Sequence, residues 1–173
     1  MKNIIKNLLV VLLLSSYSYT TAQTNSVKEA INTTLDNWHK AAAEANFEDY
    51  FNFMSSDGVF IGTDATENWQ NNAFKTFSKP YFDKGKAWDF TAIERNIYTN
   101  KTNDFAWFDE LLDTQMKICR GSGVLEKVND EWKIKHYVLS ITIPNENVTE
   151  VTKLKDSADN QLITRLKKAL DNL

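Results

Sequence analysis

His136 is a candidate for acid–base or ligand-binding chemistry. It lies in a run of alternating residues that is typical of one strand of a hairpin. A two-residue turn at Asn129-Asp130 would place Gly123 opposite His136 and leave open volume beside the imidazole ring. The ring could then act as a general base or fix a ligand by hydrogen bonding. A buried histidine bonded to one neighbouring carboxyl or hydroxyl group is the structural alternative.

Asp109 and Arg120 form a second candidate pair. They lie on adjacent expected strands, close enough in register to pair across the sheet. A carboxylate–guanidinium clamp at the floor of a pocket could bind a ligand, with Asp109 polarising water or orienting His136. The alternative is an ion pair on the outer face. A slip of one residue in the loop at Gln115-Met116 would reverse the face that Asp109 occupies.

Aromatic side chains are a third candidate feature, because 12% of the chain is Phe, Trp or Tyr. Trp69, Trp88 and Trp107 could line a site for a flat apolar ligand, although tryptophans that face a sheet also form ordinary core. Ser140 falls on the same strand face as His136. The candidate binding residues are therefore Trp69, Trp88, Trp107, Arg120, His136 and Ser140.

Helices are expected to precede these strands. A capping box at Ser26–Glu29 begins a helix that runs to about Ala45. A short second helix carries residues 47–54, and residues 59–61 form a short buried strand. A third helix is expected to open at residues 64–67, carry Trp69, and break before Pro80.

The hydrophobic period then changes from helical to alternating. Residues 88–98, 105–114, 117–127 and 132–143 are expected to be strands of an antiparallel meander. Helices followed by such a meander predict an α+β fold, with the helices on one face of a curved sheet. One face of the final hairpin is apolar or small, with the lysines on the other, and it contains Cys119, Gly121, Gly123, Leu125, Trp132, Ile134, His136, Val138 and Ser140.

The two ends of the chain have different characters. Residues 1–22 combine two lysines, an apolar run and small residues before Gln23, which predicts a secretory signal peptide cut after Ala22 and a periplasmic or secreted protein. We expect no stable membrane insertion after cleavage. Residues 147–173 predict a polar linker, irregular to about residue 157, followed by an amphipathic helix.

Composition excludes several classes of function. The formal charge of −3 would become −5 after cleavage, and a chain without a basic patch is a poor nucleic-acid binder. Cys119 is the single cysteine, so no intramolecular disulfide can form. His39 and His136 are the two histidines, which makes a multi-histidine zinc site implausible. We expect no metal and no cofactor.

The chain resembles the SnoaL-like branch of the nuclear transport factor 2-like superfamily over residues 24–146. The resemblance implies a cone-shaped α+β roll, in which the helices and the concave side of the sheet enclose a pocket. The face that carries His136 would then line this pocket. The matching features are an aromatic helix (Trp69–Phe82), Trp88 at the start of a strand, Ala106–Glu110, Arg120–Leu125, and Trp132 through Ser140.

The function implied by the resemblance stays open, because the superfamily includes isomerases, epoxide hydrolases, polyketide cyclases and members that only bind or oligomerise. The isomerase pattern is not evident, since Asp64 is the one acid near the first strand and suits a helix cap. We expect a domain that binds a small apolar or amphipathic molecule. The alternatives are an isomerase, lyase or hydrolase that uses His136 and Asp109, and a homo-oligomerising scaffold. A homodimer through the outer sheet face is the expectation that the superfamily suggests.

Overall fold

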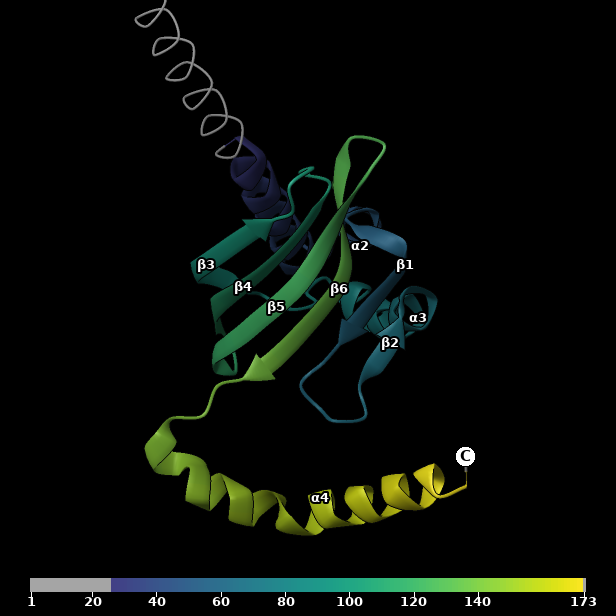
Figure 1. Cartoon of the computed structure of the whole chain (residues 1–173), viewed down its shortest axis with the longest axis vertical. Coiled ribbons are helices and arrows are strands. Elements are labelled where there is room, and N and C mark those ends of the chain that lie inside the picture. Colours follow the sequence, from purple (N-terminus) through teal and green to yellow (C-terminus); the bar gives the residue numbers. More distant parts are fainter. Residues whose placement is uncertain (1–25, 173) are drawn as a thin grey trace, which may run out of the picture. The chain divides into compact units, whose positions relative to one another are not determined.

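The computed structural model describes residues 26–172 (Figure 1). The predicted signal peptide, residues 1–22, lies outside the described residues. Contacts divide the chain after Ile141 into two units, which are described separately below.

The first unit is a helical layer on a six-stranded sheet. The sheet has the strand order β2-β1-β6-β5-β4-β3, and its neighbours are antiparallel except for β1 and β6, which are parallel. A first helix runs through residues 26–43. The elements that follow are α2 (Phe47–Asn52), β1 (Met54–Ile61), β2 (Asn68–Gln70), α3 (Asn71–Phe82), β3 (Thr91–Thr99), β4 (Phe105–Thr114), β5 (Lys117–Val128) and β6 (Glu131–Ile141).

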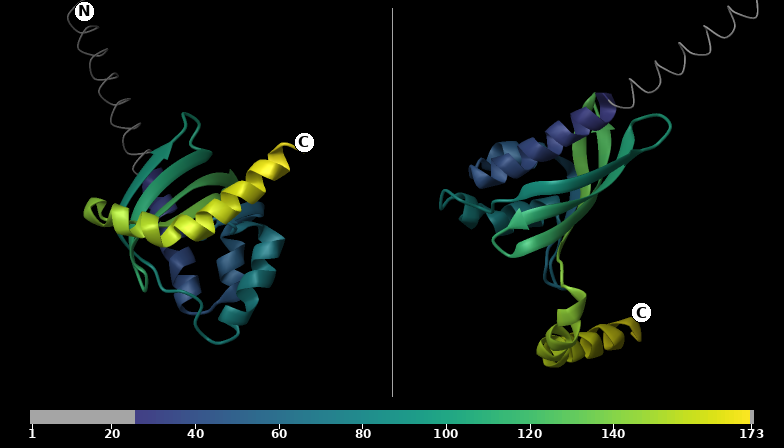
Figure 2. Two further views of the ribbon diagram at one scale, coloured as in Figure 1. Left: turned by 90° about the horizontal axis from the view of Figure 1, so that it is seen from below. Right: turned by 90° about the vertical axis from the view of Figure 1, so that its left-hand side faces the viewer.

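The helices cover one face of this sheet, which confirms the predicted α+β class (Figure 2). Aromatic rings occupy the space between the two layers. Trp38 of the first helix stacks on Tyr50 with ring centroids 5.0 Å apart and meets Tyr137 of β6 at 4.7 Å. Phe60 of β1 stacks on Phe74 of α3 at 4.1 Å. The concave side of the sheet is therefore packed with aromatic core, which stabilises the fold by removing large apolar surfaces from water.

Some predicted boundaries are wrong. Trp69 lies on the short strand β2, and α3 begins after it at Asn71. α3 also continues through Pro80 to Phe82, although a proline inside a helix removes one backbone donor. The sheet is mixed rather than fully antiparallel, since β1 pairs in parallel with β6.

The β5–β6 hairpin turns where the sequence predicted. Asn129 and Asp130 have φ angles of 50° and 67°, the left-handed pair that a two-residue hairpin turn requires. Further along, the register shifts by one residue, because Leu125 pairs with Ile134 whereas Val124 pairs with His136.

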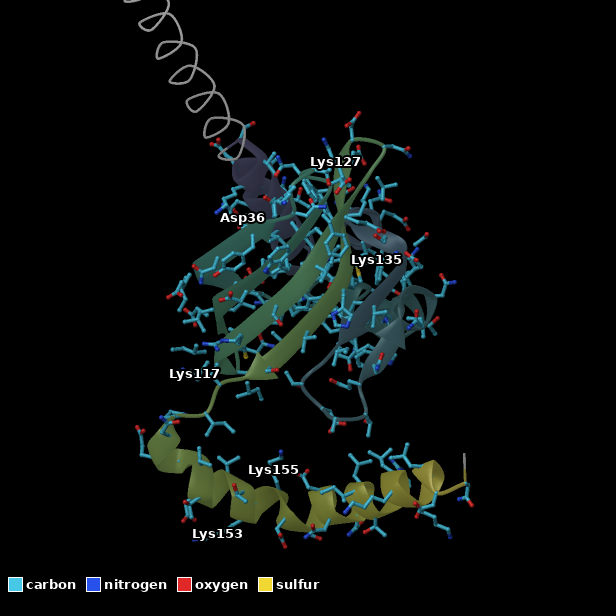
Figure 3. The ribbon with its side chains drawn as sticks, in the orientation of Figure 1. Asp36, Lys117, Lys127, Lys135, Lys153 and Lys155 are labelled. Atoms are coloured by element: carbon cyan, nitrogen blue, oxygen red, sulfur yellow. The ribbon has the colours of Figure 1, made fainter. Side chains whose placement is uncertain are left out.

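Lys135 is the extra residue in this β-bulge. Its ammonium group donates to the Asp57 carboxylate at 2.6 Å and to Glu126 at 3.1 Å (Lys135 is labelled in Figure 3). Beyond the bulge the alternation is reversed, so Tyr137 is buried on the concave side and His136 is not. The prediction that His136 shares a face with Trp132 is therefore wrong.

The second unit contains a short 3₁₀ turn (Asn145–Asn147) and α4 (Val148–Leu170). The expectation of irregular chain up to residue 157 is wrong, because α4 already begins at Val148. None of the α4 residues is buried within the chain, and Leu154, Leu166 and Leu170 are exposed. Among the described residues, no helix combines the length and apolarity needed to cross a membrane.

Candidate functional site

Glu110 is the centre of a buried polar network on the concave side of the sheet. Alternate residues of β4 face the helices, and this alternation buries the Glu110 side chain completely. One carboxylate oxygen, Oε1, accepts from Nε2 of His39 at 2.9 Å and from the Tyr137 hydroxyl at 3.1 Å. The other oxygen, Oε2, accepts from Nε of Arg95 at 2.8 Å. The carboxylate therefore accepts three hydrogen bonds from buried side chains, two at Oε1 and one at Oε2.

Strand register brings these groups together. Arg95 on β3 and Gly121 on β5 both lie directly opposite Glu110. A Cβ atom at Gly121 would collide with the Tyr137 hydroxyl and approach Glu110 Oε1 to 2.8 Å. The missing side chain at Gly121 therefore lets the tyrosine reach across β5 to the carboxylate. His39 comes from the first helix and closes the network from the opposite layer.

The electrostatics of the network keep Glu110 ionised. Burial alone would raise the pKa of this carboxyl group, but the interactions with His39 and then Arg95 outweigh burial and hold the pKa below its usual value. The pKa of Tyr137 lies well above its usual value because the hydroxyl is buried and faces the Glu110 charge. An ionised carboxylate can only accept, so the bound imidazole donates from Nε2.

Arg95 also connects the network to the first helix. Its Nη1 atom donates to Asp36 Oδ1 at 2.8 Å and to Asn32 Oδ1 at 3.1 Å. The side chain is 7% exposed, so this guanidinium is an interior bridge between the sheet and the helix.

The structure does not bring the predicted clamp together at a pocket floor. Asp109 lies opposite Ser122 and Arg120 opposite Leu111, on the outer face of the sheet. The Asp109 carboxylate accepts from the Asn96 side chain at 3.2 Å. Of the two faces that the sequence left open for Asp109 and Arg120, the structure has the outer one, because the neighbouring Glu110 occupies the concave face.

His136 and Ser140 also lie outside the aromatic core. His136 is half-buried on the outer face opposite Val124, and Ser140 is exposed opposite Arg120. The bulge at Lys135 explains both positions, because it reverses the alternation over the rest of β6. Their roles in binding stay predictions.

The three candidate tryptophans are in different environments. Trp107 lies on the outer face, is 47% exposed, and stacks on Tyr98 at 5.9 Å, so its predicted place in a pocket lining is wrong. Trp69 is half-buried against Phe77 at 4.3 Å. Trp88 packs edge-on against Tyr50 at 5.4 Å and lines a pocket.

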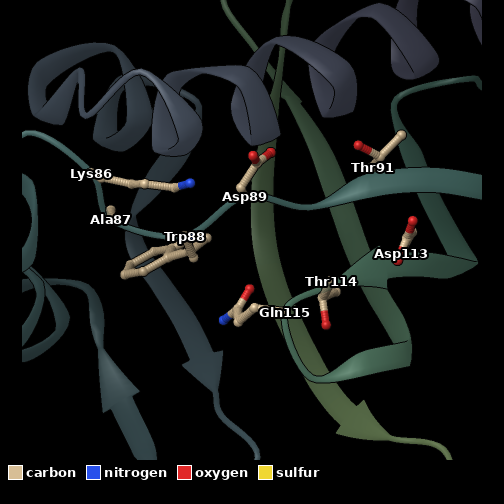
Figure 4. Close-up of a pocket in the computed structure, with 8 residues that line it drawn as sticks. All are labelled: Lys86, Ala87, Trp88, Asp89, Thr91, Asp113, Thr114 and Gln115. Atoms are coloured by element: carbon tan, nitrogen blue, oxygen red, sulfur yellow. The ribbon is translucent and has the colours of Figure 1, made fainter.

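This pocket has a volume of about 480 Å³ and opens beside the start of β3 and the end of β4 (Figure 4). Its lining combines one indole ring with two carboxylates, one ammonium group and three side chains that form neutral hydrogen bonds. The residues are Lys86, Ala87, Trp88, Asp89, Thr91, Asp113, Thr114 and Gln115. Within residues 26–172, no group of three or more His, Cys, Asp and Glu side chains could hold a metal ion.

The sequence did not single out His39, Glu110 or Tyr137 as site residues, although the helical spacing of His39 indicated that it is buried. His39 follows Ile31 and Leu35 at intervals of four, which places it on the buried stripe of the first helix. Glu110 could have been found by testing the neighbour of Asp109 in both registers. The position of Tyr137 depends on a bulge that alternation alone does not show.

A family model described as the SnoaL-like domain matches residues 31–144. The chain belongs to this family. No curated protein matches the chain. The match to the SnoaL-like domain covers all the residues of the buried network and the 480 Å³ pocket.

Solved structures share the fold at low sequence identity. A domain of unknown function with a cystatin-like fold from Nostoc punctiforme is 15% identical, with 86% of this chain and 98% of that chain covered and a TM-score of 0.60. A candidate dehydratase of the NTF2-like family from Streptomyces avermitilis is 11% identical, with 67% and 96% covered and a TM-score of 0.56. A candidate calcium/calmodulin-dependent protein kinase II association domain from Xanthomonas campestris is 18% identical, with 66% and 86% covered and a TM-score of 0.51. These likenesses establish the NTF2-like fold.

Proposed function

We propose that this SnoaL-like domain binds a small amphipathic molecule in the pocket beside Trp88. The observation that carries the proposal is an aromatic wall at the edge of a pocket whose other sides are polar. A volume of about 480 Å³ is within the ordinary range for small-molecule sites.

Trp88 is held firmly enough to serve as a binding surface. Its ring meets Tyr50 and Phe82 edge-on at 5.4 Å each and lies nearly parallel to Phe74 at 5.9 Å. A side chain fixed by its neighbours loses little further entropy when a ligand stacks on it.

The polar lining narrows the ligand class from apolar to amphipathic. Asp89 and Asp113 can accept hydrogen bonds, while Lys86 and Gln115 can donate them. A fully apolar ligand would remove these groups from water without replacing their hydrogen bonds. A ligand with a flat apolar face and polar edges would satisfy both parts of the pocket.

Native mass spectrometry of the mature protein, purified gently from its own host, tests the proposal first. A retained small molecule would then be measured for binding to the wild type, Trp88→Ala and Trp107→Ala. We expect Trp88→Ala to weaken binding by about tenfold or more, because stacking on an aromatic ring contributes ~1.5 kcal/mol. Trp107→Ala removes the same side chain from the outer face and should leave binding unchanged. Equal affinity in the two variants would contradict the proposed site.

A second candidate function is proton-transfer catalysis, and the His39–Glu110 pair favours it. When the His39 ring is neutral and Nε2 donates to Glu110, Nδ1 is the acceptor that a general base requires. The candidate dehydratase among the solved structures supports this class. His39 and Glu110 replace His136 and Asp109 as the residues to test. Equal turnover in the wild type and His39→Gln, on any substrate the protein converts, would dismiss the catalytic proposal.

The outer sheet face favours a homodimer. Tyr98 and Trp107 stack there with 47% of each residue exposed, and such aromatic pairs are common at protein interfaces. The likeness to a kinase association domain supports assembly. We expect sedimentation to report a dimer for the wild type and a monomer for Trp107→Glu. A wild type that stays monomeric at high concentration would exclude this interface.

Export to the periplasm or the exterior completes the proposal. It rests on the signal-peptide pattern of residues 1–22. Terminal peptide sequencing of the protein from its host should find Gln23 as the first residue.

A further inference from the structure

α4 carries an apolar stripe, although none of its residues is buried. The helix is 23 residues long, and Leu154, Leu166 and Leu170 are 83%, 52% and 68% exposed. In water, a helix of this kind gains most of its stability by packing its apolar side on another surface. The spacing of the stripe and the charges beside it indicate what that surface is.

The stripe is a ridge of five apolar residues at intervals of four. They are Leu154, Ala158, Leu162, Leu166 and Leu170. Side chains four apart form a row inclined to the helix axis, and two such rows interdigitate when the helices cross at about 50°. Leu162 is the middle member, with two members on either side. The same ridge on a second copy of the chain is therefore a matching surface, as an interface with two-fold symmetry requires.

Two opposite charges flank the middle of this ridge. Asp159 and Arg165 lie three residues before and after Leu162, so each is displaced from it by roughly 60° around the helix, in opposite directions. Asp159 pairs with Lys155 of the same helix at 3.0 Å, whereas Arg165 has no ion-pair partner among the described residues.

These charges distinguish the two ways in which a pair of α4 helices can cross at Leu162. When both helices point in the same general direction, Asp159 of each copy lies beside Arg165 of the other. The opposite orientation would place Asp159 beside Asp159 and Arg165 beside Arg165. Opposite charges attract and like charges repel, so the charge pattern favours the first orientation.

We propose that α4 is a self-association helix, which crosses α4 of a second copy at Leu162 and forms two Asp159–Arg165 ion pairs with it. This surface is distinct from the pocket beside Trp88 and from the outer sheet face. A single crossing of two helices buries less than the roughly 1,600 Å² of a standard interface, so we expect a weak dimer that depends on protein concentration.

Cysteine cross-linking of the mature protein tests the crossing point. Leu162→Cys would bring two thiols together at the two-fold axis, and we expect a disulfide-linked dimer on a non-reducing gel after mild oxidation. The native Cys119 is fully buried and should not react. Ser157→Cys is the matched control, because it places the thiol roughly 140° around the helix from the ridge and should leave the protein monomeric on the gel.

An uncross-linked Leu162→Cys variant would overturn the proposal and would mean that a membrane or another protein surface covers the stripe. Equal cross-linking of Leu162→Cys and Ser157→Cys would also overturn it, because random collisions would then explain both. The Leu162→Cys cross-link should persist when Trp107→Glu removes the proposed dimer through the outer sheet face. Its loss in that background would overturn a pairing through α4 alone.

Exchange of the two charges tests the orientation. In the Trp107→Glu background, Asp159→Arg should raise the dissociation constant measured by sedimentation by at least about fivefold, because two ion pairs become like-charge contacts. Asp156→Arg makes the same change of charge away from the ridge and should have little effect. Adding Arg165→Asp to Asp159→Arg should restore self-association. A double variant that associates as weakly as Asp159→Arg would overturn the paired arrangement.

Discussion

Replacing Glu110 with glutamine tests whether the buried network holds the two layers together. Glutamine keeps the shape of the side chain but provides one acceptor oxygen where the carboxylate provides two. If that oxygen faces His39 and Tyr137, the amide NH₂ group faces the Arg95 donor. If it faces Arg95, the NH₂ group faces His39 and Tyr137. The first orientation leaves a buried donor against a donor, and the second requires His39 to change tautomer and the Tyr137 hydroxyl to accept. Both orientations leave the guanidinium without its buried counter-charge.

The expected cost is large because both partners are almost fully buried. Removing one member of a buried ion pair typically costs about 3–5 kcal/mol. A domain of this size has an unfolding free energy on the order of 10 kcal/mol. The variant should therefore still fold, with a much smaller free energy of unfolding. The melting temperature should fall by about 6–20 °C.

Urea unfolding, followed by tryptophan fluorescence and circular dichroism, measures this difference directly. Asp109→Asn is the matched control, because it makes the same chemical change one residue away on the outer face. We expect the control to shift the unfolding free energy by no more than about 0.5 kcal/mol. A Glu110→Gln variant that loses less than about 1 kcal/mol, or no more than the control, would refute the structural role of the network.

The difference in unfolding free energy between the wild type and Glu110→Gln should depend on pH. The pKa of Glu110 is lower in the folded chain than in the unfolded chain, where it lies near ~4.3. The stabilisation is therefore fully present above that unfolded value and is lost as the pH falls through the folded pKa. Wild type and Glu110→Gln should differ most at neutral pH and converge in acid. A difference that stays constant into acid would mean that the charge of Glu110 is not the cause.

Three further changes probe the same site. Gly121→Ala places a methyl group against the Tyr137 hydroxyl and should cost about 1–3 kcal/mol in urea unfolding. Tyr137→Phe removes one donor to the carboxylate and should cost about 1–1.5 kcal/mol, with an unchanged dependence on urea concentration. Deleting Lys135 would return His136 to the concave side in place of Tyr137, and we expect circular dichroism to show loss of the fold. Lys135→Gln keeps the bulge and should stay within about 1 kcal/mol of the wild type.

The sequence predicted the larger elements well because their patterns are long. β4, β5 and β6 are each ten or more residues long, and their turns carry residues suited to tight loops. The boundaries near β2 failed because three residues of strand are too few to show a period. α4 began earlier than expected because its first turns are polar, and helix formation tolerates polar residues that do not pack.

The site was predicted less well, since its residues depend on single-residue shifts. Asp109 and Glu110 are adjacent acids, and the sequence offers no local reason to choose between them. His136 and Tyr137 are likewise adjacent, and the choice depends on a bulge at Lys135. This bulge is stabilised by contacts with Glu126 on the neighbouring strand and with Asp57, which is 78 residues away in the sequence. A shift of one residue exchanges the faces of a strand, so a correct strand prediction still placed the wrong side chains inside.

The buried polar atoms without a partner among the described residues include Arg95 Nη2 at the edge of the network and two atoms of the aromatic cluster, but neither oxygen of the Glu110 carboxylate. The Glu110 carboxylate accepts three hydrogen bonds and therefore has little need of a ligand. Trp38 Nε1 and Tyr50 OH, by contrast, are buried without a partner among the described residues, and both rings belong to the aromatic cluster behind Trp88. Because buried polar groups are costly when unpaired, these two atoms favour a bound molecule or water reaching inward past Trp88. A ligand that contacts them would approach the buried network without breaking it, which is why binding is the better supported function and catalysis the second.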